Sequence, residues 1–189
     1  MGKKHQRFVL ITEQADIEQV ILLNQIHLGK DLERYKNHVY RMYNYAAWYL
    51  GYAESEMRKL AIAAVFHDLA IWTHHTFDYL GPSQQLAMQY LQLHHLPESW
   101  HLEVGLIIER HHQLQKYVGV YHPTVEAFRK AVLADLTFGY TRGKMPFAAI
   151  QQATLRFPYL GFQGRLVRFA ARRFLHSPLN PLPMLRWGN

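Results

Sequence analysis

The sequence contains no cysteine, so disulfide bonds and thiolate ligands are excluded, and any bound metal must be held by imidazole and carboxylate groups. The apolar run around residues 60–66 is far too short to cross a bilayer. The basic residues 1–7 are followed by neither the apolar h-region nor the cleavage site of a secretion signal. No stretch alternates with the period of a β-strand. These absences predict a helical, cytoplasmic protein.

What the sequence does have is length, apolar content and histidine. Its 189 residues are 49% hydrophobic, which fits one globular domain with a sizeable core. The formal charge of +7 indicates an anionic partner but does not choose among phosphate, nucleic acid and a membrane surface. Thirteen histidines are an excess, and histidine is the commonest metal ligand as well as a frequent acid–base group.

Apolar residues recur at steps of three and four along most of the chain, which predicts an all-α, single-domain bundle of seven or eight helices. Thr12, Ser83 and Thr124 are expected to cap helices, and Pro97 to stand in a first helical turn. The helical domain is expected to span 1–176, with its core over about 30–140, followed by an irregular tail at 177–189. The expected helices cover approximately 12–29, 32–50, 55–72, 83–93, 97–112, 124–139, 146–156 and 163–176.

Four polar residues stand among apolar neighbours on three of these expected helices: His38, the pair His67–Asp68, and Asp135. Burying an ionised carboxylate is costly unless the charge is paired or bound to a cation. Two buried carboxylates and two imidazoles solve this problem together if they share one divalent ion. The pattern therefore predicts a metal site where three helices converge.

The order His … His-Asp … Asp resembles that of the HD-domain superfamily of metal-dependent phosphohydrolases. His67 follows His38 by 29 positions, and Asp135 follows Asp68 by 67. The piece HVYRMYNYA is similar to the first-histidine helix of the family, AAVFHDLA to its His-Asp helix end, and AVLADLTFG to its last-aspartate helix. The resemblance spans roughly residues 30–140.

The resemblance implies that His38, His67, Asp68 and Asp135 bind one divalent ion, of manganese, cobalt, nickel, magnesium, zinc or iron. Asp68 then also acts in catalysis. The implied activity is hydrolysis of a phosphomonoester or phosphoanhydride of a small molecule, with a nucleotide as the expected substrate. The alternative is a catalytically weak HD-fold protein that binds a nucleotide or regulates a partner.

One departure from the family concerns the general base. Many HD nucleotidases carry a glutamate shortly after the His-Asp pair, but here the next acid is Asp78, in an expected loop. Asp78 is the best carboxylate candidate for a catalytic acid or base, with His74 and His75 as alternatives.

Adjacent histidines occur twice between Asp68 and Asp135. For His111 and His112 a catalytic role is expected, either in binding a second metal ion or in contacting phosphate, because binuclear members of the family carry an adjacent histidine pair in this interval. His94 and His95 are better explained by a helix carboxyl end, where a cation is favourable.

Three arginines are candidates for binding the substrate: Arg41, Arg34 and Arg110. Arg41 lies one turn from His38 and is similar to an arginine of the family's first-histidine helix. A surface ion pair with Glu33 or a packed side-chain stem explains Arg41 equally well.

The stretch GRLVRFAARRFLH is basic and amphipathic. Packing of its apolar side on the domain is the simpler explanation, and an anionic membrane surface or nucleic acid is the alternative partner. The sequence leaves open whether the protein forms a homo-oligomer.

Overall fold

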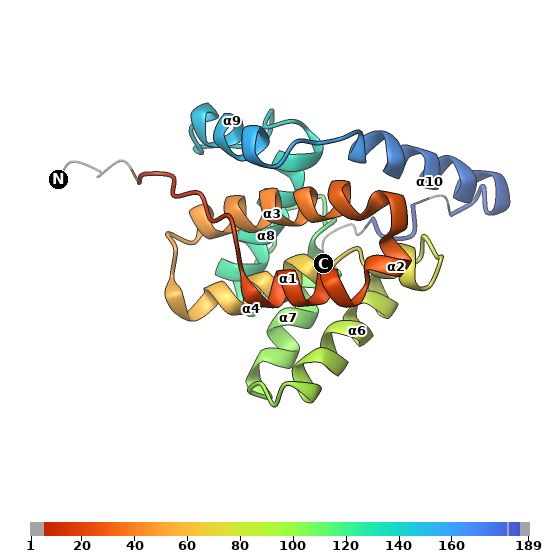
Figure 1. Cartoon of the computed structure of the whole chain (residues 1–189), viewed down its shortest axis with the longest axis horizontal. Coiled ribbons are helices and arrows are strands. Elements are labelled where there is room, and N and C mark those ends of the chain that lie inside the picture. Colours follow the sequence, from red (N-terminus) through yellow and green to blue (C-terminus); the bar gives the residue numbers. More distant parts are fainter. Residues whose placement is uncertain (1–5, 181, 186–189) are drawn as a thin grey trace.

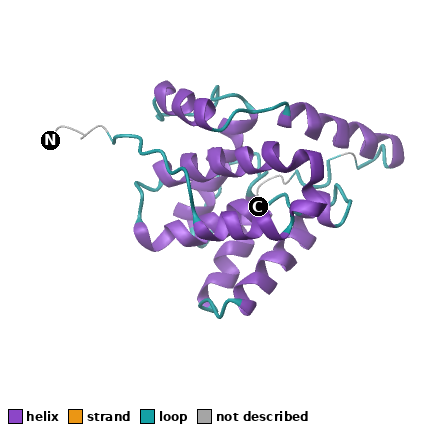
Figure 2. Cartoon of the chain, viewed as in Figure 1, coloured by secondary structure: helices purple, strands orange, loops and turns teal. Residues whose placement is uncertain are grey.

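The computed structural model describes residues 6–180 and 182–185. Within these residues the chain is all-helical, with no strand (Figure 2), and eight of its α-helices have nine residues or more. This confirms the predicted fold class. Among the described residues, no helix combines the length and apolar composition that a membrane crossing requires.

The first third of the chain forms α1 (Ala15–Leu23), α2 (Gln25–Leu28), a 3-10 turn (Gly29–Asp31) and α3 (Leu32–Tyr49). The expected cap at Thr12 is wrong, because the side chain of Gln14 accepts the hydrogen bond from the backbone N–H of Ile17 at 2.9 Å. The first helix also ends early, at Leu23. Ile26, which lies within the range expected for this helix, is 88% exposed.

The central helix is α4 (Glu54–Phe66), which contacts α1, α3, α6, α7 and α8. Every residue from Lys59 to Phe66 is buried, because small alanines let the neighbouring helices approach from several sides. The helix ends before His67, and a turn leads into the short α5 (Ala70–Thr73). The expected continuous helix to Trp72 is therefore broken at the His-Asp pair.

Next, α6 (Leu80–Leu93) and α7 (Ser99–Arg110) form an antiparallel pair at the lower edge of the view in Figure 1. Ser83 does not cap α6 as expected. It lies inside the helix, fully buried, and its Oγ accepts a hydrogen bond from the backbone N–H of Ala70 at 3.3 Å. Pro97 lies two residues before α7 rather than in its first turn.

The helix α8 (His122–Leu136) makes its most extensive contact with α3. Thr124 lies inside this helix rather than capping it, and its hydroxyl donates to Glu103 Oε1 at 2.6 Å. The chain turns after α8 at Gly139, whose φ of +84° favours glycine and where a Cβ would come within 2.9 Å of the Ile150 side chain.

The last two helices, α9 (Phe147–Arg156) and α10 (Phe162–His176), lie along the outer side of α3 (Figure 1). The described residues of the tail, 177–180 and 182–185, contain no helix, and Met184 is buried against the core.

Candidate metal centre

The helix α3 carries His38 and Arg41 one turn apart, and both side chains are buried because α8 and the α9–α10 connection cover them. Asp135 of α8 contacts both. Its Oδ2 lies 2.7 Å from His38 Nδ1, and Arg41 binds both carboxylate oxygens, through Nε at 2.5 Å and Nη2 at 3.0 Å. Arg41 also donates to the backbone carbonyls of Phe157 and Pro158. The buried carboxylate is thus compensated by a bidentate guanidinium.

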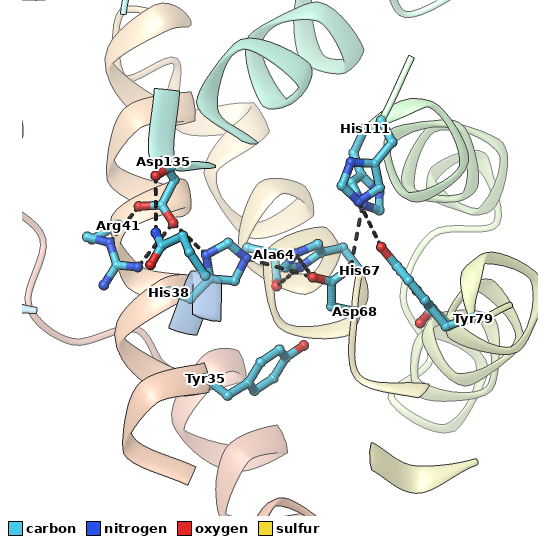
Figure 3. Close-up of polar contacts among 12 residues, drawn as sticks. Tyr35, His38, Arg41, Ala64, His67, Asp68, Tyr79, His111 and Asp135 are labelled. Atoms are coloured by element: carbon cyan, nitrogen blue, oxygen red, sulfur yellow. Dashed lines mark hydrogen bonds and ion pairs between the residues drawn. The ribbon is translucent and has the colours of Figure 1, made fainter. Parts of the chain in front are cut away.

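The His67–Asp68 pair lies at the carboxyl end of α4, where the turn directs both side chains toward α3 and α7 (Figure 3). His67 Nδ1 donates to the backbone carbonyl of Ala64 at 2.7 Å. Its other ring nitrogen, Nε2, lies 3.2 Å from Nε2 of His38. The two imidazoles therefore face each other through their Nε2 atoms.

Hydrogen-bond acceptors fix the tautomers of three imidazoles. A carbonyl or carboxylate oxygen only accepts, so Nδ1 carries the proton in His38, in His67, and in His111, whose Nδ1 donates to the Ile108 carbonyl at 2.6 Å. Their Nε2 atoms are therefore unprotonated, and each presents a lone pair. Nε2 of His38 and Nε2 of His67 lie 3.2 Å apart, and neither can donate a hydrogen bond to the other. A cation that binds both lone pairs would satisfy them.

Asp68 adds a carboxylate to the same space. Its Oδ2 lies 3.2 Å from His67 Nε2 and 3.9 Å from His38 Nε2, and its Oδ1 lies 3.5 Å from His111 Nε2. Asp68 Oδ1 and His111 Nε2 are both buried without a hydrogen-bond partner. Unpartnered buried polar atoms are rare in folded proteins and call for a bound group.

The donor atoms fall into two overlapping sets that share Asp68. One set is His38, His67 and Asp68, and the other is Asp68, His111 and His112; within each set, one ligand atom per residue lies within 4.8 Å of the others. Imidazole nitrogen with carboxylate oxygen suits zinc, manganese, iron and similar divalent ions. The residues present therefore fit a divalent cation, and we call His38, His67, Asp68 and His111 the Nε2 cluster.

Burial favours the neutral form of three imidazoles in this region, those of His38, His111 and His112. It lowers the pKa of His38 to about 4, even though Asp135 opposes the shift, and it also lowers the pKa of His111. The pKa of His112 lies well below its usual range, because of burial and then the neighbouring His111. Burial alone would raise the pKa of Asp135, but Arg41 and His38 outweigh it and lower that pKa. Neutral imidazoles are the form that binds a metal.

His112 lies at the rim of the Nε2 cluster and is only half-buried. Its Nε2 forms a hydrogen bond with the Tyr79 hydroxyl at 2.7 Å. Both residues also line an apolar groove of about 410 Å³ that runs along α10 to Met184. This groove connects the edge of the cluster with the surface.

Of the four expected metal ligands, Asp135 is the one that the structure does not bring together with the others, and its role as a ligand stays a prediction. Its carboxylate contacts Nδ1 of His38, on the side of the ring away from His67, and Arg41 occupies both of its oxygens (Figure 3). Asp135 belongs to neither set of converging ligand atoms. Its contact with Nδ1 fixes the orientation of the His38 ring, with Nε2 directed toward His67.

The three arginines expected to bind substrate do not gather at the cluster. Arg41 is fully buried in its pair with Asp135, so neither a surface ion pair nor a substrate contact describes it. Arg34 forms an ion pair with Asp31, and Nη2 of Arg110 lies 3.6 Å from Oε1 of Glu109.

The expected general base also lies apart from the cluster. Asp78 is exposed in the loop before α6, where its backbone N–H donates to the Thr76 hydroxyl, and its side chain makes no hydrogen bond or ion pair with the cluster. His74 and His75 are exposed in the same loop.

Three aromatic residues at the site have no sequence pattern that predicts their place there. Phe162 stacks on His38 with ring centroids 4.0 Å apart, and Phe128 meets the rings of His67 and His111 edge-on. The Tyr79 hydroxyl forms a hydrogen bond with His112. Helical periodicity marks only Phe128 as a core residue, because Tyr79 and Phe162 lie outside the expected helices. Only the tertiary structure places them against the histidines.

Comparisons of the chain with protein-family models, with curated proteins and with solved structures found no match.

Proposed function

We propose that the protein is a metal-dependent phosphohydrolase that acts on a small phosphorylated molecule, with nucleotides as the first class to test. The observation that carries this proposal is the convergence of three Nε2 lone pairs and the Asp68 carboxylate on one buried space. The HD-like order of His38, His67–Asp68 and Asp135 supports it as a resemblance.

In this proposal the Nε2 cluster holds the ion, and Asp135 fixes the His38 ring by accepting its Nδ1 proton. A divalent ion bound there would lower the pKa of water and polarise a phosphoryl oxygen. Arg41 keeps Asp135 ionised and takes no part in binding the substrate. His112 stands between the cluster and the apolar groove, so it is the side chain that meets a substrate entering along that groove, or that completes a second metal site.

The test is turnover of a phosphoester panel by the purified protein loaded with manganese, cobalt, nickel, magnesium, zinc or iron. The panel holds p-nitrophenyl phosphate, its bis-ester and nucleoside mono-, di- and triphosphates. We expect turnover by the wild type and its loss in Asp68→Ala. The matched control is His27→Ala, because His27 is an exposed histidine of α2. An absence of turnover with every metal, or equal turnover in Asp68→Ala, would overturn the proposal.

A second candidate function is a metal-stabilised binding or regulatory protein of the same fold. The favouring observation is the closure of the site: His38, His67, Asp68 and His111 are at most 2% exposed, and Phe162 covers the His38 ring. Calorimetric titration with nucleotides separates the two candidates. A tight complex that is never hydrolysed in the metal-loaded protein favours the regulatory function.

A further inference from the structure

The net charge of the chain resides entirely in its last part. Residues 136–189 hold eight of the 21 lysines and arginines and none of the 14 acidic residues. Residues 1–135 therefore hold 13 basic and 14 acidic residues and are almost neutral as a whole. The part that is basic corresponds to α9, α10 and the segments that flank them.

The helix α10 has two apolar sides. On the inner side, Phe162 is buried, and Leu166 and Phe169 pack against the core. This contact is the one expected of an amphipathic helix that covers its domain. It does not account for the apolar residues on the opposite side of the helix.

The outer side of α10 is apolar and open to solvent. Val167, Ala171, Phe174 and Leu175 follow one another at helical spacing, which places them on one face. Phe174 is 55% exposed and Leu175 is 79% exposed. Leu179, just after the helix, is completely exposed. We call Val167, Ala171, Phe174 and Leu175 the outer face of α10.

Two unpaired arginines flank this outer face. Arg168 and Arg172 are exposed, lie one turn apart, and form no ion pair within the described residues. Arg165, by contrast, is held on the domain side by Asp31 at 2.8 Å. Free cations along the edge of an exposed apolar stripe are the pattern of a helix that lies in the plane of an anionic membrane.

We propose that the outer face of α10 docks on the surface of an anionic lipid bilayer. Arg168 and Arg172 contact the phosphate and carboxylate groups of the lipid heads, while Phe174 and Leu175 enter the boundary with the acyl chains. A nucleic acid would match the arginines but would leave the exposed Val167, Phe174 and Leu175 without a partner. The helix projects along the edge of the domain (Figure 1), so a flat surface reaches it. This proposal stands independently of the metal centre.

The experiment is co-sedimentation of the full-length, metal-free protein with vesicles of phosphatidylcholine, with and without about a third of phosphatidylserine. We expect binding to the anionic vesicles only. Phe174→Ser with Leu175→Ser should weaken it at least about tenfold, since two apolar side chains leave the lipid. Arg168→Gln with Arg172→Gln should weaken it about 25-fold, near fivefold for each charge.

The matched control for the apolar pair is Leu22→Ser with Leu23→Ser, because these two adjacent leucines of α1 are 62% and 68% exposed, away from the basic helices. The control for the charges is Arg7→Gln with Lys30→Gln, both exposed. Circular dichroism checks that each variant keeps its helix content.

Three results would overturn the proposal. One is an absence of binding to anionic vesicles, and another is equal weakening in the control variants, which would indicate attraction by overall charge. The third is tight binding to duplex DNA or RNA that depends on Arg168 and Arg172 but not on Phe174 and Leu175, which would identify a nucleic-acid surface. None of these results depends on turnover or on a bound metal, so failure here leaves the proposed function untouched.

Discussion

The buried pair of Arg41 and Asp135 permits a quantitative test of the site's construction. Both side chains are completely buried, and the guanidinium also satisfies the Phe157 and Pro158 carbonyls. Removing one member of such a pair leaves an uncompensated charge in the core and costs about 3–5 kcal/mol. Arg41→Met leaves the Asp135 carboxylate with His38 alone, and Asp135→Asn leaves the guanidinium without its counter-charge.

The double variant Arg41→Met with Asp135→Asn contains neither charge. Its loss in free energy of unfolding should therefore be smaller than the sum of the two single losses, by about 2 kcal/mol or more. Urea unfolding of the metal-free protein, followed by circular dichroism, gives the three free energies. A single variant that fails to fold while the double variant folds would show the same coupling. Additive costs, or single costs of about 0.5 kcal/mol as for exposed residues, would refute the reasoning.

Three further predictions concern the histidines and their packing. Because the pKa of His38 is about 4 in the folded protein against an ordinary 6.5, only the unfolded chain takes up this proton between those pH values. Acidification from pH 6.5 to 4 should therefore remove about 3 kcal/mol of stability, and His38→Gln should flatten the measured pH dependence; an unchanged slope contradicts the assignment. Phe128→Ala should lower the free energy of unfolding in urea by about 3–5 kcal/mol, because the fully buried ring fills the space beside His67 and His111. A loss below about 1 kcal/mol would contradict that packing. A divalent ion at about a hundred times its Kd should stabilise the wild type by about 2.7 kcal/mol and leave His67→Ala unchanged, as scanning calorimetry would show.

The sequence predicted the all-helical fold, and of the four residues expected to converge the structure brings His38, His67 and Asp68 together. Those predictions rest on apolar neighbours in the sequence and on helical periodicity, which are local properties of the chain. A buried ionised group needs a partner wherever it lies, so an apolar sequence context was enough to mark His38, Asp68 and Asp135.

The same reasoning could not tell which partner each charge has. Asp135 and Asp68 have similar apolar neighbours in the sequence, yet one pairs with Arg41 and the other faces three imidazoles. Arg41 looked like a surface or substrate-binding residue because the segment that covers it, around Phe157, lies far along the chain. Long-range contacts of this kind are set by tertiary packing and leave no local pattern.

The helix ends show a similar limit. Thr12, Ser83 and Thr124 are all good capping residues by type. Ser83 and Thr124 instead lie inside helices, where their hydroxyls bond to Ala70 and Glu103. A hydroxyl that satisfies a neighbouring helix cannot be distinguished from a cap by sequence alone.

The convergence of Nε2 atoms is tested most directly by counting metal ions in the protein. Inductively coupled plasma mass spectrometry, after loading with manganese or zinc and exhaustive desalting, gives the ratio of metal to chain for the wild type, His67→Ala and the exposed-site control His27→Ala. We predict about one ion per chain in the wild type and in the control, and its loss in His67→Ala. A wild type that retains no ion, or a His67→Ala variant that retains as much as the control, would contradict the account.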